Sequence, residues 1–218
     1  MKGYIQILLV CLAIIGLRCG GSPLAGSGSQ TTNSILVAVR DDSIKGRAEP
    51  GLAVDLFSAD YDPLYDVGYR ARVRAGEDSL FAFTGLDTNE TYALLAVLDD
   101  STCGVYLSGL SLGAGDGRSS QRKYAFSETE SISGTVQNIP EGLPMSQVVV
   151  YLQATPFGAR ADTTGRFSID FVPRAHYRVR ADIVFDTMNP PYTGGPVSDD
   201  WFEVSTKEGP AEVVVELR

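Results

Sequence analysis

Cysteine, histidine and tryptophan are all scarce in this 218-residue chain, which has three Cys, one His and one Trp. No set of Cys and His residues has the spacing of a zinc site. No long segment shows a helical period, and no apolar run reaches the roughly 18 residues that indicate a membrane-spanning helix. We therefore expect no metal centre, no cofactor and no helical bundle.

Positive charge is also in deficit, because 18 Lys and Arg stand against 27 Asp and Glu, for a net charge of −9. No acidic residue precedes Asp41, so removal of a leader with Lys2 and Arg18 leaves 16 basic against 27 acidic residues, or −11. Such a chain repels a polyanion, and we expect no nucleic-acid partner. The 44% of hydrophobic residues suffices for a core, while 23 Gly and 11 Pro favour an all-β chain with many turns.

The N-terminus has the pattern of an export signal. A short basic start is followed by an apolar run of 14 residues, from Tyr4 to Leu17. This run is short for a membrane span and suits the core of a signal peptide, which we place at residues 1–18. Cleavage near Ala25 and an uncleaved anchor are the alternatives.

Cys19, followed by Gly-Gly-Ser, resembles the processing site of bacterial lipoproteins, although Arg18 stands where a small residue is usual. The resemblance implies that Cys19 is acylated and that residues 19–33 form a lipidated, flexible spacer on the outer membrane of a bacterial envelope. Cys11 would leave with the leader, so Cys103 would be alone and no intramolecular disulfide could form. We expect Cys103 to be a small, partly buried apolar residue.

Alternation of period two marks two strands, at residues 167–171 and 177–183, on either side of a Pro-containing turn. The pattern predicts an antiparallel hairpin with one apolar face, which requires a second sheet to cover it and hence a sandwich. The same order of aromatic pair, turn and Tyr recurs earlier, at residues 81–92. We therefore predict two sandwich modules, at residues 34–128 and 129–218.

Other strands are predicted from the same alternation, at residues 35–39, 52–57, 92–98, 105–110, 122–126, 132–136, 148–152 and 212–217. We match the strand at 35–39 with that at 132–136, because each lies 16 or 17 residues before the next strand. The first module then carries an insertion of ten residues at Tyr61–Arg70. The short junction predicts modules packed end to end.

Three segments carry a family resemblance: Asp162-Thr-Thr-Gly-Arg-Phe-Ser-Ile169, then Val172-Pro173, then Tyr177-Arg-Val179. They resemble the signature of carboxypeptidase regulatory-like domains, which are transthyretin-like sandwiches similar to collagen-adhesin B-type repeats and starch-binding-like folds. The likeness covers most of residues 131–218, and residues 35–127 more loosely. It implies two tandem Greek-key, transthyretin-like β-sandwiches and a non-catalytic role.

One catalytic motif is present, Gly109-Leu-Ser111-Leu-Gly113, which matches the nucleophile elbow of serine hydrolases. The only His, His176, lies downstream of it. An elbow needs a strand, a sharp turn and a helix, but the Gly- and Ser-rich continuation has no helical period. We keep a serine hydrolase at Ser111 only as a remote alternative, and treat His176 as a solvated turn residue.

Acidic residues gather in loops, as pairs at 41–42, 99–100 and 199–200 and as Asp60, Asp62 and Asp66 in the insertion. None follows the spacing of a calcium loop, so we interpret them as solubilising charge.

A long irregular loop, residues 188–200, ends on the only Trp and is the best candidate for a ligand site. An exposed aromatic ring can stack on a sugar while nearby carboxylates or an amide bind its hydroxyls. The candidate residues are Asn189, Tyr192, Asp199, Asp200 and Trp201, with Tyr61, Tyr65 and Tyr69 of the insertion as possible additions. Burial of Trp201 in the core is the alternative.

The sequence thus favours a non-catalytic, envelope-anchored lipoprotein whose two sandwich modules contact an envelope protein or a polymer. A carbohydrate-binding protein using residues 188–202 is the alternative. Neither the ligand nor the oligomeric state follows from the sequence.

Overall fold

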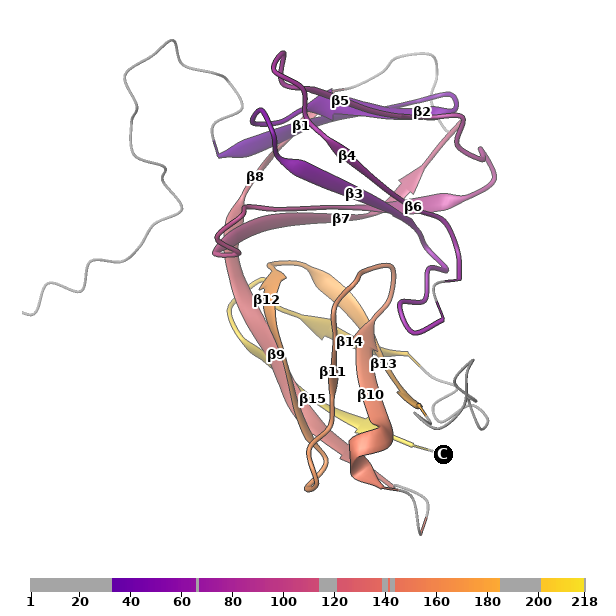
Figure 1. The fold of residues 1–218 in the computed structure, drawn as a ribbon, viewed down its shortest axis with the longest axis vertical. Coiled ribbons are helices and arrows are strands. Elements are labelled where there is room, and N and C mark those ends of the chain that lie inside the picture. Colours follow the sequence, from indigo (N-terminus) through magenta and orange to yellow (C-terminus); the bar gives the residue numbers. More distant parts are fainter. Residues whose placement is uncertain are drawn as a thin grey trace, which may run out of the picture.

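The computed structural model describes residues 33–65, 67–113, 121–138, 141, 144–184 and 201–217. Within these ranges the chain forms fifteen strands and one short 3₁₀ turn, η1 (Met145–Gln147). The strands build two stacked sandwich modules, so the predicted all-β, two-sandwich fold class is confirmed (Figure 1). Over the same ranges, no helix has the length and apolarity needed to span a membrane.

The first module packs a sheet of order β5-β2-β1-β8 against one of order β4-β3-β6-β7. The strands of the first sheet are β1 (Ser34–Arg40), β2 (Ser43–Arg47), β5 (Leu80–Thr84) and β8 (Arg122–Ala125). Those of the second are β3 (Ala53–Ser58), β4 (Arg70–Arg74), β6 (Thr91–Val97) and β7 (Cys103–Ser111). Alternate residues of both sheets point into one core, which includes the fully buried Ile35, Leu56 and Leu94.

The second module packs a sheet of order β11-β10-β13-β14 against β12, β9 and β15. The first of these sheets contains β10 (Val148–Leu152), β11 (Gly158–Arg160), β13 (His176–Ile183) and β14 (Phe202–Ser205). The other contains β9 (Ser127–Gln137), β12 (Arg166–Pro173) and β15 (Ala211–Glu216), with β15 parallel to β9. Val150, Val179 and Val215 are fully buried in the core between them.

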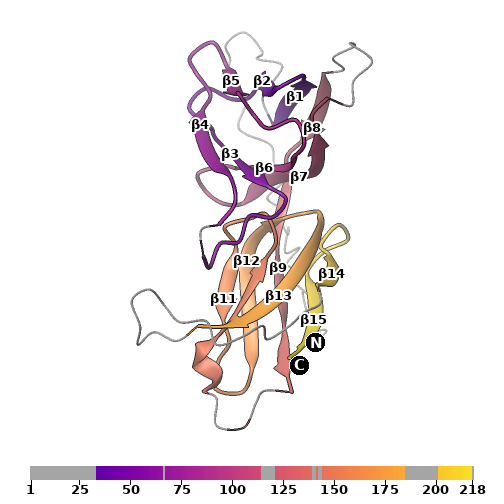
Figure 2. The ribbon, with the colours of Figure 1, turned by 90° about the vertical axis from the view of Figure 1, so that its right-hand side faces the viewer.

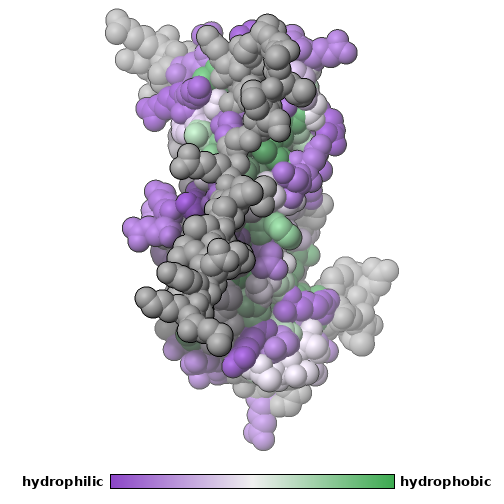
Figure 3. Space-filling model, turned by 90° about the vertical axis from the view of Figure 1, so that its left-hand side faces the viewer, coloured by the Kyte–Doolittle hydropathy of each residue, from purple (hydrophilic) through white to green (hydrophobic). Residues whose placement is uncertain are grey.

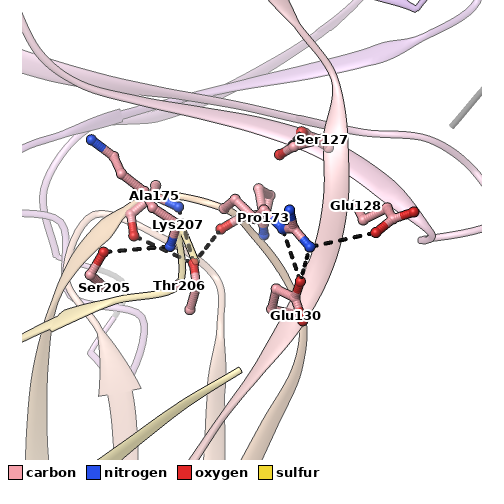
Figure 4. Close-up of polar contacts among 10 residues, drawn as sticks. Ser127, Glu128, Glu130, Pro173, Ala175, Ser205, Thr206 and Lys207 are labelled. Atoms are coloured by element: carbon pink, nitrogen blue, oxygen red, sulfur yellow. Dashed lines mark hydrogen bonds and ion pairs between the residues drawn. The ribbon is translucent and has the colours of Figure 1, made fainter. Parts of the chain in front are cut away.

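The predicted hairpin at residues 167–183 is wrong, because its two strands lie in opposite sheets. β12 pairs with β9, whereas β13 pairs with β10 and β14. The connection between them, residues 174 and 175, passes from one sheet to the other, and buried hydroxyls bind the backbone there: Thr206 Oγ1 donates to the Pro173 carbonyl oxygen at 3.1 Å (Figure 4). The Tyr177 hydroxyl donates to the Pro173 carbonyl oxygen at 2.7 Å, and Thr206 Oγ1 accepts the Ala175 N–H at 3.0 Å. β5 and β6 of the first module are split between sheets in the same way.

The internal repeat has a different register from the predicted one. Gly46 of β2 lies opposite Phe81, and Gly134 of β9 lies opposite Phe167. A Cβ atom added to Gly46 or Gly134 would lie 2.4 or 2.9 Å from the Cζ atom of the facing Phe ring. The counterpart of β9 is therefore β2, and β1 is an additional strand between β2 and β8.

The two modules share one continuous sheet, because β9 pairs with strands of both. Cys103 and Gly104 of β7 pair with Glu128 and Ser127 at the start of β9, which then continues into the second module. β9 passes without a break through residues 128 and 129, where we place the module boundary. Arg174 also links the β12–β13 connection to β9, with its Nε atom 2.9 Å from Glu130 Oε1 (Figure 4).

The modules do not pack end to end as predicted. Phe57 of β3 and Leu95 of β6 point away from the core of the first module and pack on Ala154, in the β10–β11 connection of the second. One end of the second module therefore abuts a sheet face of the first, and the strands of the two modules run in nearly perpendicular directions (Figures 1 and 2). The outer positions Phe57, Ala93 and Leu95 of that sheet are apolar because this contact buries them.

Exposed large apolar side chains are scattered over both modules: Tyr65, Val67, Tyr69, Leu80, Phe171 and Val214. The face shown in Figure 3 correspondingly has small hydrophobic areas among hydrophilic ones. Scattered residues of this kind are normal for a protein surface and do not by themselves indicate a partner.

Candidate functional site

The predicted insertion forms part of the contact between the modules. The β3–β4 connection spans residues 59–69, whereas its counterpart between β10 and β11 spans residues 153–157. Gln153 Nε2 donates to the Ala59 carbonyl oxygen at 2.7 Å, and the Ala154 N–H donates to the Tyr61 carbonyl oxygen at 3.3 Å. Tyr61 is only 2% exposed and its ring centroid lies 4.9 Å from that of Phe57. Its ring therefore cannot stack on a sugar.

A buried tyrosine hydroxyl extends this contact. Tyr151 Oη on β10 lies 2.6 Å from Asp182 Oδ2 on β13 and 3.0 Å from Asp62 Oδ2 on the insertion. Burial raises the pKa of the Tyr151 hydroxyl, and its hydrogen bond with Asp182 raises it further. The hydroxyl thus stays protonated at neutral pH, as a fixed polar contact between the second module and the insertion.

Trp201 lies beside this hydroxyl, just before β14, on the outer face of the sheet. The indole meets the Tyr151 ring edge-on at 5.9 Å between centroids, and the Arg180 guanidinium lies 5.7 Å above the indole centroid. Arg180 also lies 3.5 Å from Asp182. Trp201 is half-buried and lies outside the core. Its ring face is not fully free, because the Arg180 guanidinium covers part of it. The other candidate residues, Asn189, Tyr192, Asp199 and Asp200, lie outside the described residues, as does Cys19, and the site there stays a prediction.

Ser111 does not have the geometry of a nucleophile elbow. The motif starts within β7 and its serine is the last residue of that strand, where Ser111 still pairs with β6, opposite Thr91. The Ser111 hydroxyl lies 3.4 Å from the Thr91 hydroxyl, at an exposed position. His176 belongs to β13 of the second module, where it pairs with Ser205. An elbow would place the serine on a sharp turn after the strand, so this remote alternative loses its structural basis.

Cys103 differs from the prediction, because it is disulfide-bonded rather than alone. It is 2% exposed at the start of β7. Cys103 is the only cysteine of the described ranges, so its partner lies outside them.

A pocket of about 310 Å³ opens on the first module, between the β3–β4 and β5–β6 connections. The described residues that line it are Ser58, Asp60, Gly68, Tyr69, Gly85, Leu86, Asp87, Glu90 and Tyr92. They combine two aromatic rings and one aliphatic side chain with three carboxylates, which is the mixture typical of small-ligand sites. No group of three or more His, Cys, Asp or Glu side chains suited to a metal ion occurs in the described part of the chain.

Sequence reasoning identified only part of this pocket. Tyr69 is among the possible ligand contacts that the sequence predicts, but Asp87, Glu90 and Tyr92 fall within the predicted turn and strand of residues 81–98. A sequence signal for this pocket is a loop glycine followed within two residues by an aromatic or acidic residue, at Gly68-Tyr69 and at Gly85-Leu-Asp87. Both glycines have a positive φ, of 94° and 69°, which turns the chain sharply at the pocket wall.

No family model matches this sequence, and no curated protein does either. The resemblance to carboxypeptidase regulatory-like domains therefore stays a prediction. Among solved structures, a minor pilin of Streptococcus agalactiae aligns with a TM-score of 0.35 and 13% identity, over 79% of this chain and 84% of the pilin. The major pilin subunit of Bacillus cereus gives 0.30 and 8%, over 86% and 71%. A fimbrial protein from Bacteroides ovatus gives 0.23 and 10%, over 78% and 46%. TM-scores below 0.5 do not establish a shared fold, so the architecture rests on the strand pairing and cores described above.

Proposed function

We propose that the chain is a non-catalytic lipoprotein of a bacterial cell envelope, anchored through a lipid on Cys19, whose two modules present loops to a partner. The proposal combines the leader and spacer of the sequence with the coupling of the modules. The rigid connection of the modules is the observation that supports a role in presenting loops. β9 is continuous between the modules, and a buried contact joins the insertion to the second module. Such a connection favours a stiff support over two freely hinged domains.

The anchor is tested by metabolic labelling of the full chain with an alkyne fatty acid in a bacterial host that processes lipoproteins. We expect label and membrane partition for the unchanged chain and for Cys11→Ser, and loss of both for Cys19→Ser. Arg18→Ala should increase processing, since a small residue is usual before the acylated cysteine. Equal labelling of the Cys11→Ser and Cys19→Ser chains would refute the anchor.

The second candidate is glycan binding by residues 188–202. One observation favours it: Trp201 is half-buried on an outer sheet face beside Arg180, rather than packed in the core. A sugar ring would stack on the part of the indole that Arg180 leaves free, while Asn189, Asp199 or Asp200 bind its hydroxyls.

Trp201 is the only tryptophan, so its fluorescence reports directly on this candidate. We expect a saturable change in emission with a bound polysaccharide, and its loss in Tyr192→Ala but not in Phe171→Ala, which removes an exposed aromatic ring that is not a candidate contact. Emission indifferent to plant and bacterial polysaccharides, with no retention on insoluble ones, would remove the candidate.

A further inference from the structure

The pocket on the first module has walls held in place by internal hydrogen bonds. Ser58 Oγ at the end of β3 accepts the Tyr69 N–H at 2.8 Å and contacts the Asp60 carboxylate. On the opposite wall, the Tyr92 hydroxyl accepts the Asp87 N–H at 3.0 Å. Two loops distant in sequence are thus fixed around one cavity, which is the condition for a preformed ligand site.

The aromatic part of the pocket has one buried and one accessible ring. Tyr92 is 2% exposed and forms the floor, and Tyr69 meets it edge-on at 5.9 Å between centroids. Tyr69 remains 41% exposed, so much of its ring faces solvent. Leu86 adds an aliphatic contact. These groups can pack on the methylenes of a ligand or hold a cation over the Tyr69 ring.

The polar part of the pocket has one sign of charge. Asp60, Asp87 and Glu90 contribute carboxylates, and the described lining residues include no Lys, Arg or His. Within the described ranges none of the three has an ion-pair partner, whereas Asp55 and Asp182 each have an arginine. The pocket therefore has a negative potential that attracts a cation, and no three of the described acidic side chains are close enough to hold a metal ion together.

We propose that this pocket binds an alkylammonium group, with the charged nitrogen toward the acidic side of the pocket (Asp60, Asp87 and Glu90) and the methylenes against Tyr69 and Leu86. The size of the cavity favours such a group over a bare ion. With a volume of about 310 Å³, the pocket would remain mostly filled with solvent around a single ion. A chain of four or five methylenes ending in an ammonium fills it better and uses the aromatic and aliphatic walls. The same chemistry occurs in lysine side chains and in free aliphatic amines.

Calorimetric titration of the full chain with n-pentylammonium chloride tests the proposal, with 1-pentanol as the neutral probe of similar shape. We expect saturable binding of the ammonium alone, weaker at about 150 mM than at about 10 mM salt, because exposed charges are screened over a shorter distance. Glu90→Gln should weaken binding roughly fivefold, the worth of one exposed ion pair. Tyr69→Ala should weaken it as well.

Glu77→Gln is the matched control, since it removes an exposed glutamate from another loop of the same module. Equal affinities of Glu90→Gln and Glu77→Gln, or equal binding of pentanol and pentylammonium, would overturn the proposal. Unchanged urea midpoints for the variants would show that the loss is not unfolding. N-α-acetyl-lysine methylamide distinguishes the two sources: tighter binding than pentylammonium indicates a lysine side chain, and weaker binding a free amine. The result does not depend on acylation of Cys19.

Discussion

Each module contains a glycine that lies opposite a phenylalanine ring, Gly46 opposite Phe81 and Gly134 opposite Phe167, and substitution of the glycine tests how closely the strands pack there. A Cβ added to Gly134 would lie 1.9 Å from the Val213 carbonyl oxygen on β15 and 2.9 Å from Phe167 Cζ. At Gly46 the corresponding distances are 2.0 Å to the Leu36 carbonyl oxygen and 2.4 Å to Phe81 Cζ. A ring can rotate, but a backbone oxygen moves only with its strand. Gly134→Ala must therefore push β15 away from β9.

We expect Gly134→Ala to lower the free energy of unfolding by about 3 kcal/mol, at the upper end of overpacking in a close-packed core. With a urea m-value of about 2 kcal/mol/M, the midpoint would fall by about 1.5 M. Trp201 reports unfolding of the same module. Phe167→Leu should rescue Gly134→Ala only partly, because the closer atom is the carbonyl oxygen of Val213 rather than the ring.

Gly51→Ala is the control for a glycine with open space. No atom lies within 4 Å of its added Cβ, but its φ of 83° disfavours alanine, so we expect a cost of about 1 kcal/mol. A midpoint for Gly134→Ala as high as that for Gly51→Ala would refute the close approach of β9, β12 and β15.

Three further outcomes follow from the buried polar groups. Tyr151→Phe should lower the free energy of unfolding by about 1–3 kcal/mol, since it leaves the buried Asp182 without its 2.6 Å partner, and should speed proteolysis of the β3–β4 connection. Burial raises the pKa of the Tyr106 and Tyr177 hydroxyls above 10. The free energy of unfolding should therefore be unaffected by these groups below pH 10 and should fall above it, by about 1.4 kcal/mol per pH unit for each tyrosine. Urea midpoints measured against pH test this, and Tyr106→Phe should make the decrease with pH less steep. Cys103 is disulfide-bonded in the structure, whereas acylation turns the Cys19 sulfur into a thioether, which cannot form a disulfide. Acylated, leader-free protein should therefore have one free thiol, at Cys103; a thiol count of zero in denaturant would contradict acylation of Cys19.

Most strands could be predicted from the sequence, apart from β2, β4, β11 and β14, but their partners could not. Alternation such as that of Phe167 and Ile169 shows which side chains share a face, and the structure places these residues inside. The same alternation arises whether the next strand is a hairpin partner or lies across the core. The crossing at Pro173 depends on the buried hydroxyls of Tyr177 and Thr206, and Thr206 lies 33 residues further along the chain. The match of residues 35–39 with 132–136 failed because equal spacing says nothing about which strand faces the aromatic ring.

In the insertion, likewise, the sequence alone does not tell which tyrosine is buried and which lines the pocket. Tyr61, Tyr65 and Tyr69 recur every four residues, and the sequence gives no reason to treat them differently. Tyr61 is buried by contacts with Phe57 and Ala154, whereas Tyr69 is placed by Ser58 at the rim of a pocket completed by another loop. The different environments of Tyr61 and Tyr69 therefore result from long-range contacts on the two sides of the loop. Because the module contact fixes one side of this loop, it also helps to hold the pocket wall on the other, so packing of the modules and shape of the pocket depend on the same residues.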